Sequence, residues 1–130
     1  MSHFSTIKTR IKKKPELIEA LELLQYNVVE DQELRVSGAH GNNHEIVEAE
    51  VAISNDIGFR MNPTTGDYEL VADLETWNQP IPPNRFIDKV TQQYARMTIH
   101  NTVKEKGFEV QEEWEMDDNS IELIVTRWTN

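Results

Sequence analysis

Residues 108–125 read FEVQEEWEMDDNSIELIV, and this stretch decides the fold. The apolar side chains of its first half are Phe108, Val110, Trp114 and Met116. Glutamate and glutamine stand between them, as on a strand with one apolar and one solvent-facing side. The polar run 117–120 turns the chain, and apolar residues return at positions 121, 123 and 125. The stretch therefore predicts a β-hairpin that buries Trp114 in the core.

Upstream of this hairpin, the chain predicts a long amphipathic helix over about residues 84–106. Pro82 and Pro83 suit a helix start, because a proline in the first turn lacks an N–H that would have no helical partner. Apolar side chains recur at helical spacing at Phe86, Val90, Tyr94 and Met97. Gly107 is expected to end the helix, since glycine readily adopts the left-handed conformation that closes helices.

The first half of the chain predicts the remaining elements. Alternation indicates a first strand over residues 4–11, and Pro15 begins a helix that we expect to end near Asn27. Short strands follow over residues 28–36, and the run 37–44 has the composition of a loop. Further strands are predicted over residues 47–53, 57–61 and 68–72, the last two as a hairpin.

The predicted order is β-α-β-β-β-β-α-β-β, within one domain that spans residues 1–130. This order favours the α+β class, with an antiparallel or mixed sheet and both helices on one face. A split βαβ topology related to the ferredoxin-like folds is the preferred arrangement. We expect the other face, rich in glutamate, to meet water. Residues that should share the apolar face include Val47, Ala49, Val51, Leu70, Val110 and Leu123.

Composition excludes several classes of function. The 130 residues include no cysteine, so disulfides, thiolate metal sites and thiol catalysis are all absent. The net charge is −10, and only residues 1–14 are basic, with five cations and no acid. An acidic body repels phosphate backbones, so we expect no direct binding to nucleic acid. Because no signal peptide or membrane span is visible, a cytoplasmic protein is expected, and no motif calls for a cofactor.

Segments spread over the chain carry a family resemblance. The chain starts with Ser2-His3-Phe4 and closes with Arg127-Trp128. Between them stand Asp56-Ile57-Gly58-Phe59, Tyr68-Glu69-Leu70-Val71-Ala72-Asp73-Leu74, Gln92-Gln93-Tyr94-Ala95 and Lys106-Gly107-Phe108. In this order they resemble a family of small plastid and cyanobacterial proteins known as a hypothetical chloroplast open reading frame, with a domain of unknown function. The resemblance implies cyanobacterial cytoplasm, plastid stroma or a virus of such a host, and it implies no catalytic residues.

Two positions depart from the pattern of that family. Its long helix commonly continues after Tyr-Ala with an aromatic residue and a histidine, where this chain has Arg96-Met97. If that histidine has a chemical role, it is lost here or moved to His100. The first helix of the family often ends with glycine, where this chain has Asn27.

Two groups of residues are candidates for chemistry. His3 with Asp56 and Asp73 could serve a small enzyme or ligand-binding site, because histidine and carboxylates carry acid–base chemistry. The more ordinary interpretation gives them structural roles at strand ends. His40 and His44 could bind a transition metal, yet a Gly/Asn loop lacks the preorganised geometry of a metal site, which favours a surface loop.

Trp77 and Trp128 are the candidates for an interface, because a half-exposed tryptophan is a frequent anchor in protein–protein contacts. With no recognisable catalytic constellation, we favour a non-enzymatic accessory protein over an enzyme. Its partner is expected to be another protein, with a basic surface or an apolar groove that complements the acidic body.

Overall fold

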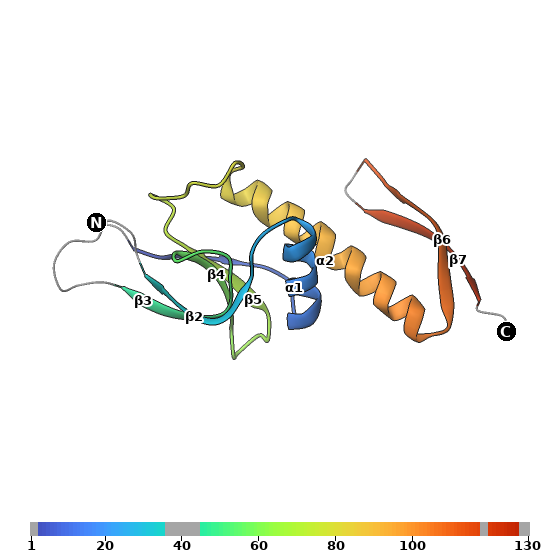
Figure 1. The fold of residues 1–130 in the computed structure, drawn as a ribbon, viewed down its shortest axis with the longest axis horizontal. Coiled ribbons are helices and arrows are strands. Elements are labelled where there is room, and N and C mark those ends of the chain that lie inside the picture. The colour runs from blue at the N-terminus through green and yellow to red at the C-terminus, as the bar shows by residue number, and fades with distance from the viewer. Residues whose placement is uncertain (1–2, 36–44, 118–119, 128–130) are drawn as a thin grey trace.

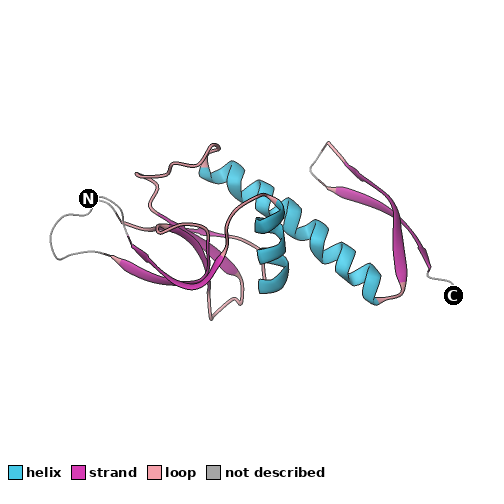
Figure 2. Cartoon of the chain, in the orientation of Figure 1, coloured by secondary structure: helices cyan, strands magenta, loops and turns pink. Residues whose placement is uncertain are grey.

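The structure is a computed structural model that describes residues 3–35, 45–117 and 120–127. The candidates His40, His44 and Trp128 lie outside these residues. Nine elements follow one another in the predicted order, and the α+β class is confirmed (Figure 2). They are β1 (Ser5–Lys8), α1 (Lys14–Leu23), β2 (Val29–Arg35), β3 (Ile46–Ala52), β4 (Ile57–Met61), β5 (Tyr68–Ala72), α2 (Pro83–Glu105), β6 (Phe108–Glu115) and β7 (Ile121–Arg127).

The strands form two separate sheets (Figure 1). Five of them pair in the order β1-β5-β4-β3-β2, and every pair is antiparallel. Four antiparallel pairings separate β1 from β2, so these two strands run in the same direction at opposite edges of the sheet. α1 therefore connects parallel strands that are not neighbours, as in a split βαβ unit. β6 and β7 pair only with each other, so Val110 and Leu123 do not share a face with Val51 and Leu70 as expected.

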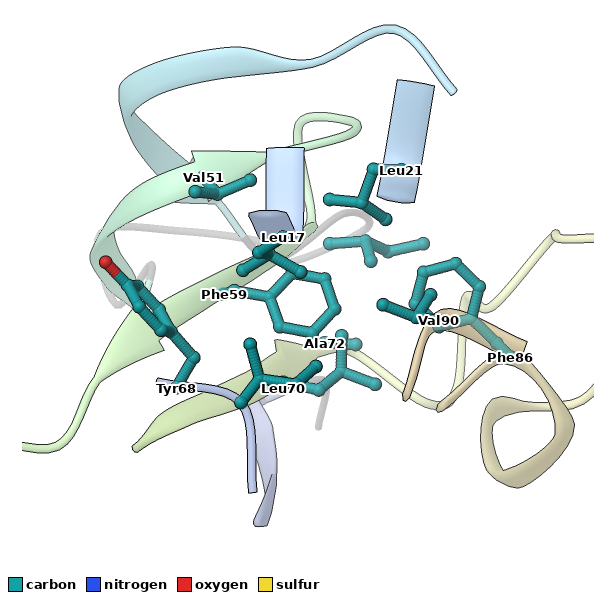
Figure 3. Packing of buried hydrophobic residues seen from close by; sticks show 11 residues of the cluster. Leu17, Leu21, Val51, Phe59, Tyr68, Leu70, Ala72, Phe86 and Val90 are labelled. Carbon is teal, nitrogen blue, oxygen red and sulfur yellow. The ribbon is translucent and has the colours of Figure 1, made fainter. Parts of the chain in front are cut away.

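Both helices lie on one side of the five-stranded sheet, and their apolar residues build the main core there (Figure 3). Phe86 of α2 stacks on Phe59 of β4 with ring centroids 6.2 Å apart, and Tyr26 meets Phe86 edge-on at 5.3 Å. The fully buried members of this core are Ile11, Leu17, Leu21, Val51, Ile57, Phe59, Tyr68, Leu70, Ala72, Phe86 and Val90.

The opposite face of the sheet is apolar as well, which contradicts the expected water-facing surface. Leu34, Ala49 and Val71 are buried there, each at most 1% exposed, and Ala52 belongs to the same cluster. All five residues of β5 are buried, so this strand is covered on both sides. Because Ala49 packs on this face and Val51 on the helix side, the prediction that they share one face is wrong. In β2, Glu30 pairs with Val51 and Gln32 pairs with Ala49, and Asp31 between them has φ of 53°, outside the range of a regular strand.

The two helices end in different ways. α1 ends at Leu23, before the predicted Asn27, and Gln25 takes the left-handed conformation with φ of 70°. The N–H of Tyr26 then donates to the carbonyl of Leu21 at 3.0 Å, which is a Schellman closure with glutamine in the usual glycine position. α2 is followed by Gly107 with φ of 82°, as predicted.

Only the first part of α2 belongs to the core. Its buried residues are Phe86 and Val90, and the hydroxyl of Tyr94 accepts hydrogen bonds from the N–H groups of Lys12 and Lys13. Beyond this point α2 runs away from the five-stranded sheet and carries the β6–β7 hairpin at its far end (Figure 1). The molecule therefore presents a packed body and an arm.

Candidate functional site

The register of the main sheet brings two of the candidate acids to one end of it. Ala72 is paired with Ile57 on one side and with Ser5 on the other, so Asp56, Asp73 and the start of β1 are neighbours at that end. His3 lies two residues before β1 and is exposed. The four pockets lined by residues within 92–121, 31–50, 100–110 and 85–92 do not include His3, Asp56 or Asp73 in their walls.

The hydrogen bonds of these acids stabilise turns. One carboxylate oxygen of Asp56 accepts from the hydroxyl of Ser54 at 2.9 Å, and the other accepts from Thr76 at 3.1 Å. Asp73 is 1% exposed, and its Oδ1 accepts from the N–H of Glu75 at 3.0 Å, the bond expected of an aspartate at a turn. These contacts give both carboxylates a structural use, and a reaction at this end of the sheet stays a prediction.

Trp77 is partly buried beside the main core. Its indole N–H donates to the carbonyl of Ile81 at 2.8 Å, and its ring meets Phe86 edge-on at 5.5 Å. These contacts hold the proline-rich connection against the start of α2. The proposed role of Trp77 at an interface stays a prediction.

The β6–β7 hairpin is the part of the described chain with the least burial. None of its described residues falls in the buried class, and neither strand has a second neighbouring strand among the described residues. An isolated two-stranded hairpin is marginally stable in water and leaves two rows of backbone groups without strand partners.

A β-bulge divides the hairpin into two phases. The register shifts between Val110 and Glu112, so Gln111 is an extra residue outside the strand pairing, although its side-chain amide donates to Oγ1 of Thr126 in β7 at 3.0 Å. One inserted residue moves every later side chain of the strand to the other face. Odd-numbered residues beyond the bulge therefore take the face that even-numbered residues occupy before it. Glu113 therefore points toward α2, and Trp114 is 41% exposed. The prediction that Trp114 lies in the core is wrong.

The outer face of the hairpin gathers exposed apolar side chains. Trp114 is paired with Glu122 and Glu112 with Ile124, so Trp114 and Ile124 are diagonal neighbours on one face. Ile124 is 47% exposed, and Met116, at the turn, is 39% exposed. We call Glu112, Trp114, Met116, Glu122 and Ile124 the hairpin patch.

On the inner side, Glu113 ties the hairpin to α2. Its Oε1 lies 2.5 Å from Nε of Arg96, and its Oε2 accepts a hydrogen bond from Nη2 of Arg96 at 3.0 Å. Nε2 of His100 is 3.1 Å from the same Oε2. His100 thus faces the hairpin rather than the main sheet or open water.

The surroundings of Glu113 also change its titration. Burial by itself raises the pKa of this carboxyl group, since it disfavours the charged form. The hydrogen bonds and positive charge of Arg96 and His100 act in the other direction and leave the pKa of Glu113 lowered from 4.5. The side chain of Glu113 is only 17% exposed, so it remains an ionised group in a largely covered position.

Two pockets lie along the junction of α2 and the hairpin. The first has a volume of about 240 Å³ and lies near the hairpin turn, and the second, of about 310 Å³, lies near Gly107. Residues around the first are Gln92, Gln93, Arg96, Glu113, Trp114, Glu115 and Ile121. The described residues contain no group of three or more histidine and acidic side chains placed to hold a metal ion. Neither described helix has both the length and the apolar character needed to cross a bilayer.

Comparison with known proteins gives a family without an assigned activity. A family model described as "Protein of unknown function (DUF1257)" matches residues 20–124. The chain is 36% identical over 132 residues to "Uncharacterized protein ycf35" of Pyropia yezoensis and 34% identical over 130 residues to that of Cyanophora paradoxa. It is 35% identical over 133 residues to the protein of the same name in Guillardia theta, and each of these three matches covers 98% of both chains. No solved structure matches the chain.

Proposed function

The chain belongs to the hypothetical chloroplast open-reading-frame family that carries the DUF1257 domain, and from this premise we propose that it is a non-enzymatic accessory protein that binds another protein through the hairpin patch. Family membership as such assigns no reaction, since the relatives are named as uncharacterised. The proposal therefore depends on the surface of this chain.

One observation carries the proposal: Trp114 and Ile124 are exposed diagonal neighbours on the face of the hairpin opposite Glu113, and β6 and β7 have no further strand partner among the described residues. Tryptophan is enriched among the residues that contribute most to protein–protein binding, because it buries a large area with few rotatable bonds. A partner that covered the patch would also complete the packing of a hairpin that is marginal alone.

Charge selects the kind of partner. Residues 108–127 contain seven acidic side chains and one basic side chain, Arg127. Within the patch, Glu112 and Glu122 flank the two apolar residues. A second copy of the chain would bring the same negative charge against itself, which disfavours dimerisation through this face. The occupant that fits is a different protein, with an apolar pocket bordered by lysine or arginine.

The relatives also indicate the cell compartment in which this binding would take place. The relatives of this chain are plastid-encoded proteins of a red alga, a glaucophyte and a cryptophyte. We propose that the chain meets its partner in the plastid stroma or in cyanobacterial cytoplasm, including that of a virus-infected cell.

Site-specific crosslinking tests this function. A photoreactive amino acid would replace Ile124 in one variant and Leu23 in another, because Leu23 is an apolar residue on α1 that is at least as exposed, at 57%, and lies outside the hairpin. We expect the Ile124 variant to give a defined adduct with one host protein and the Leu23 variant to give none. The same adducts from both positions would contradict the proposal.

Binding of the purified partner then provides the quantitative test. Trp114→Ala should weaken binding at least 30-fold, about 2 kcal/mol, which is typical of a residue that dominates an interface. Leu23→Ala should leave the affinity unchanged. Added salt should weaken binding, since oppositely charged exposed groups are screened. Equal affinity of the Trp114→Ala variant and the natural chain would refute the assignment.

A further inference from the structure

The pocket near the hairpin turn has the size of a site for one side chain. Its volume of about 240 Å³ is below the ~300–1,000 Å³ typical of small-molecule and cofactor sites. Walls come from both sides of the junction: Gln92, Gln93 and Arg96 from α2, and Glu113 to Glu115 with Ile121 from the hairpin. Trp114 belongs both to this lining and to the hairpin patch, so the pocket adjoins the proposed binding surface.

The charges around the pocket favour a cation. Arg96 is the single cation among the described residues that line it, and both of its contacts given above go to Glu113. These two charges offset each other, and Glu115 adds a second carboxylate. The lining thus has an excess of one negative charge, together with the two amide oxygens of Gln92 and Gln93, which accept hydrogen bonds. An anion would meet two carboxylates, whereas a guanidinium or ammonium group would be attracted.

We propose that this pocket receives an arginine or lysine side chain of the partner protein, beside the apolar contact at Trp114. This inference rests on the proposed function and specifies what the partner must present: a basic residue next to its apolar pocket. Arginine suits the site better than lysine, because its planar group donates several hydrogen bonds at once to carboxylate and amide oxygens.

A titration of the full chain with a small probe tests the pocket without the partner. The probe is N-acetyl-arginine amide, and its control is N-acetyl-citrulline amide, which has the same shape but no charge. In NMR spectra of the labelled protein, we expect the arginine compound to shift the side-chain amide signals of Gln92 and Gln93 and the signals of Glu115. A dissociation constant of about 1 mM or weaker is expected for one buried contact. Citrulline should bind at least 5-fold more weakly.

Two matched variants separate the pocket from general electrostatic attraction. Glu115→Gln should reduce arginine binding to the level of citrulline. Glu109→Gln should leave it unchanged, because Glu109 is an exposed carboxylate of the same strand that does not line this pocket. Six residues of strand separate the two positions by roughly 20 Å, about twice the screening length in 0.1 M salt.

Three results would overturn the inference: equal NMR shifts with the arginine and citrulline compounds, an equal loss of arginine binding in the Glu115→Gln and Glu109→Gln variants, or no shift near the pocket at high probe concentration. A partner that crosslinks at position 124 and binds the Glu115→Gln variant with unchanged affinity would overturn the pocket and leave the proposed function standing. If the pocket binds arginine but no protein crosslinks at position 124, the proposed function is overturned and the pocket stands.

Discussion

Arg96 of α2 holds Glu113 of β6 through both carboxylate oxygens, with Nε 2.5 Å from Oε1 and Nη2 3.0 Å from Oε2. The pair joins two elements that otherwise meet through partly buried side chains, so it fixes how the hairpin lies along the helix. The hydrogen bond from Nη2 to Oε2 is charge-assisted, and the close approach of Nε to Oε1 adds electrostatic attraction.

Glu113→Gln should loosen the hairpin without unfolding the body. Arg96 is 43% exposed, so solvent screening limits the effect, and we expect backbone amides of β6 and β7 to exchange hydrogen about 10-fold faster, near 1.4 kcal/mol. Amides of β4 and β5 should keep their rates. Glu109→Gln serves as the control, since that glutamate is exposed on the same strand. Uniform acceleration over the whole chain would contradict a local role.

Acid should loosen the hairpin in the same way. The pKa of Glu113 is lowered in the folded protein, so the unfolded state binds more protons at pH values between the two pKa values. The stabilisation by Glu113 is therefore fully present above about pH 4.5, its ordinary value, and is lost as the pH falls through the lower folded value. Hydrogen exchange or NMR signals of β6 and β7 between pH 6 and 3 report this loss. In the Glu113→Gln variant this part of the acid dependence should disappear.

Gly58→Ala should destabilise the body. A Cβ at this position would lie 2.9 Å from the carbonyl oxygen of Val51, 3.0 Å from Cβ of Ala49 and 3.1 Å from Cδ1 of Leu34. Overpacking of this kind costs about 1–3 kcal/mol, measurable by urea unfolding. Combining it with Ala49→Gly should restore a part of the loss, because one of the three close contacts is removed. A stability equal to that of the natural chain would mean that the second apolar face is loosely packed.

Gln25→Gly should make the protein more stable. Gln25 has φ of 70°, a conformation that costs a side-chain-bearing residue roughly 1–2 kcal/mol, and its side chain is exposed. After the greater entropy of glycine in the unfolded chain is subtracted, we expect a gain of about 0.5–1 kcal/mol and a Tm higher by about 2–4 °C. Gln25→Ala should give no gain, since alanine also carries a Cβ. A lower Tm for the glycine variant would refute this explanation of the helix end.

The order of the elements could be predicted because each depends on local pattern. Helical spacing at Phe86 and Val90, the stop at Gly107 and the alternation in the last hairpin all point to the structure that forms. The family could be predicted for a related reason, since segments over nearly the whole length recur in order.

Two features could not be predicted: which distant strands pair, and where an irregularity within a strand moves the later side chains to the other face. Ala49 and Val51 are spaced as on one face of a strand, yet they pack in different clusters, next to the point where Asp31 of β2 has a positive φ. In the hairpin, one unpaired residue at Gln111 moves Trp114 from the expected core to the surface. A signal was present: position 112, on the side of the strand expected to be apolar, is a glutamate. Nothing in the pattern showed that the hairpin would stand as a separate sheet.

The pairing of β1 with β5 has a practical consequence for anyone who shortens this protein. Ser5–Lys8 occupies the hydrogen-bonding edge of Tyr68–Ala72, a strand with no exposed residue. A chain that lacked its first eight residues would present that apolar strand as a free edge, ready to add strands from other molecules and form aggregates. A shortened chain should therefore keep Ser5–Lys8.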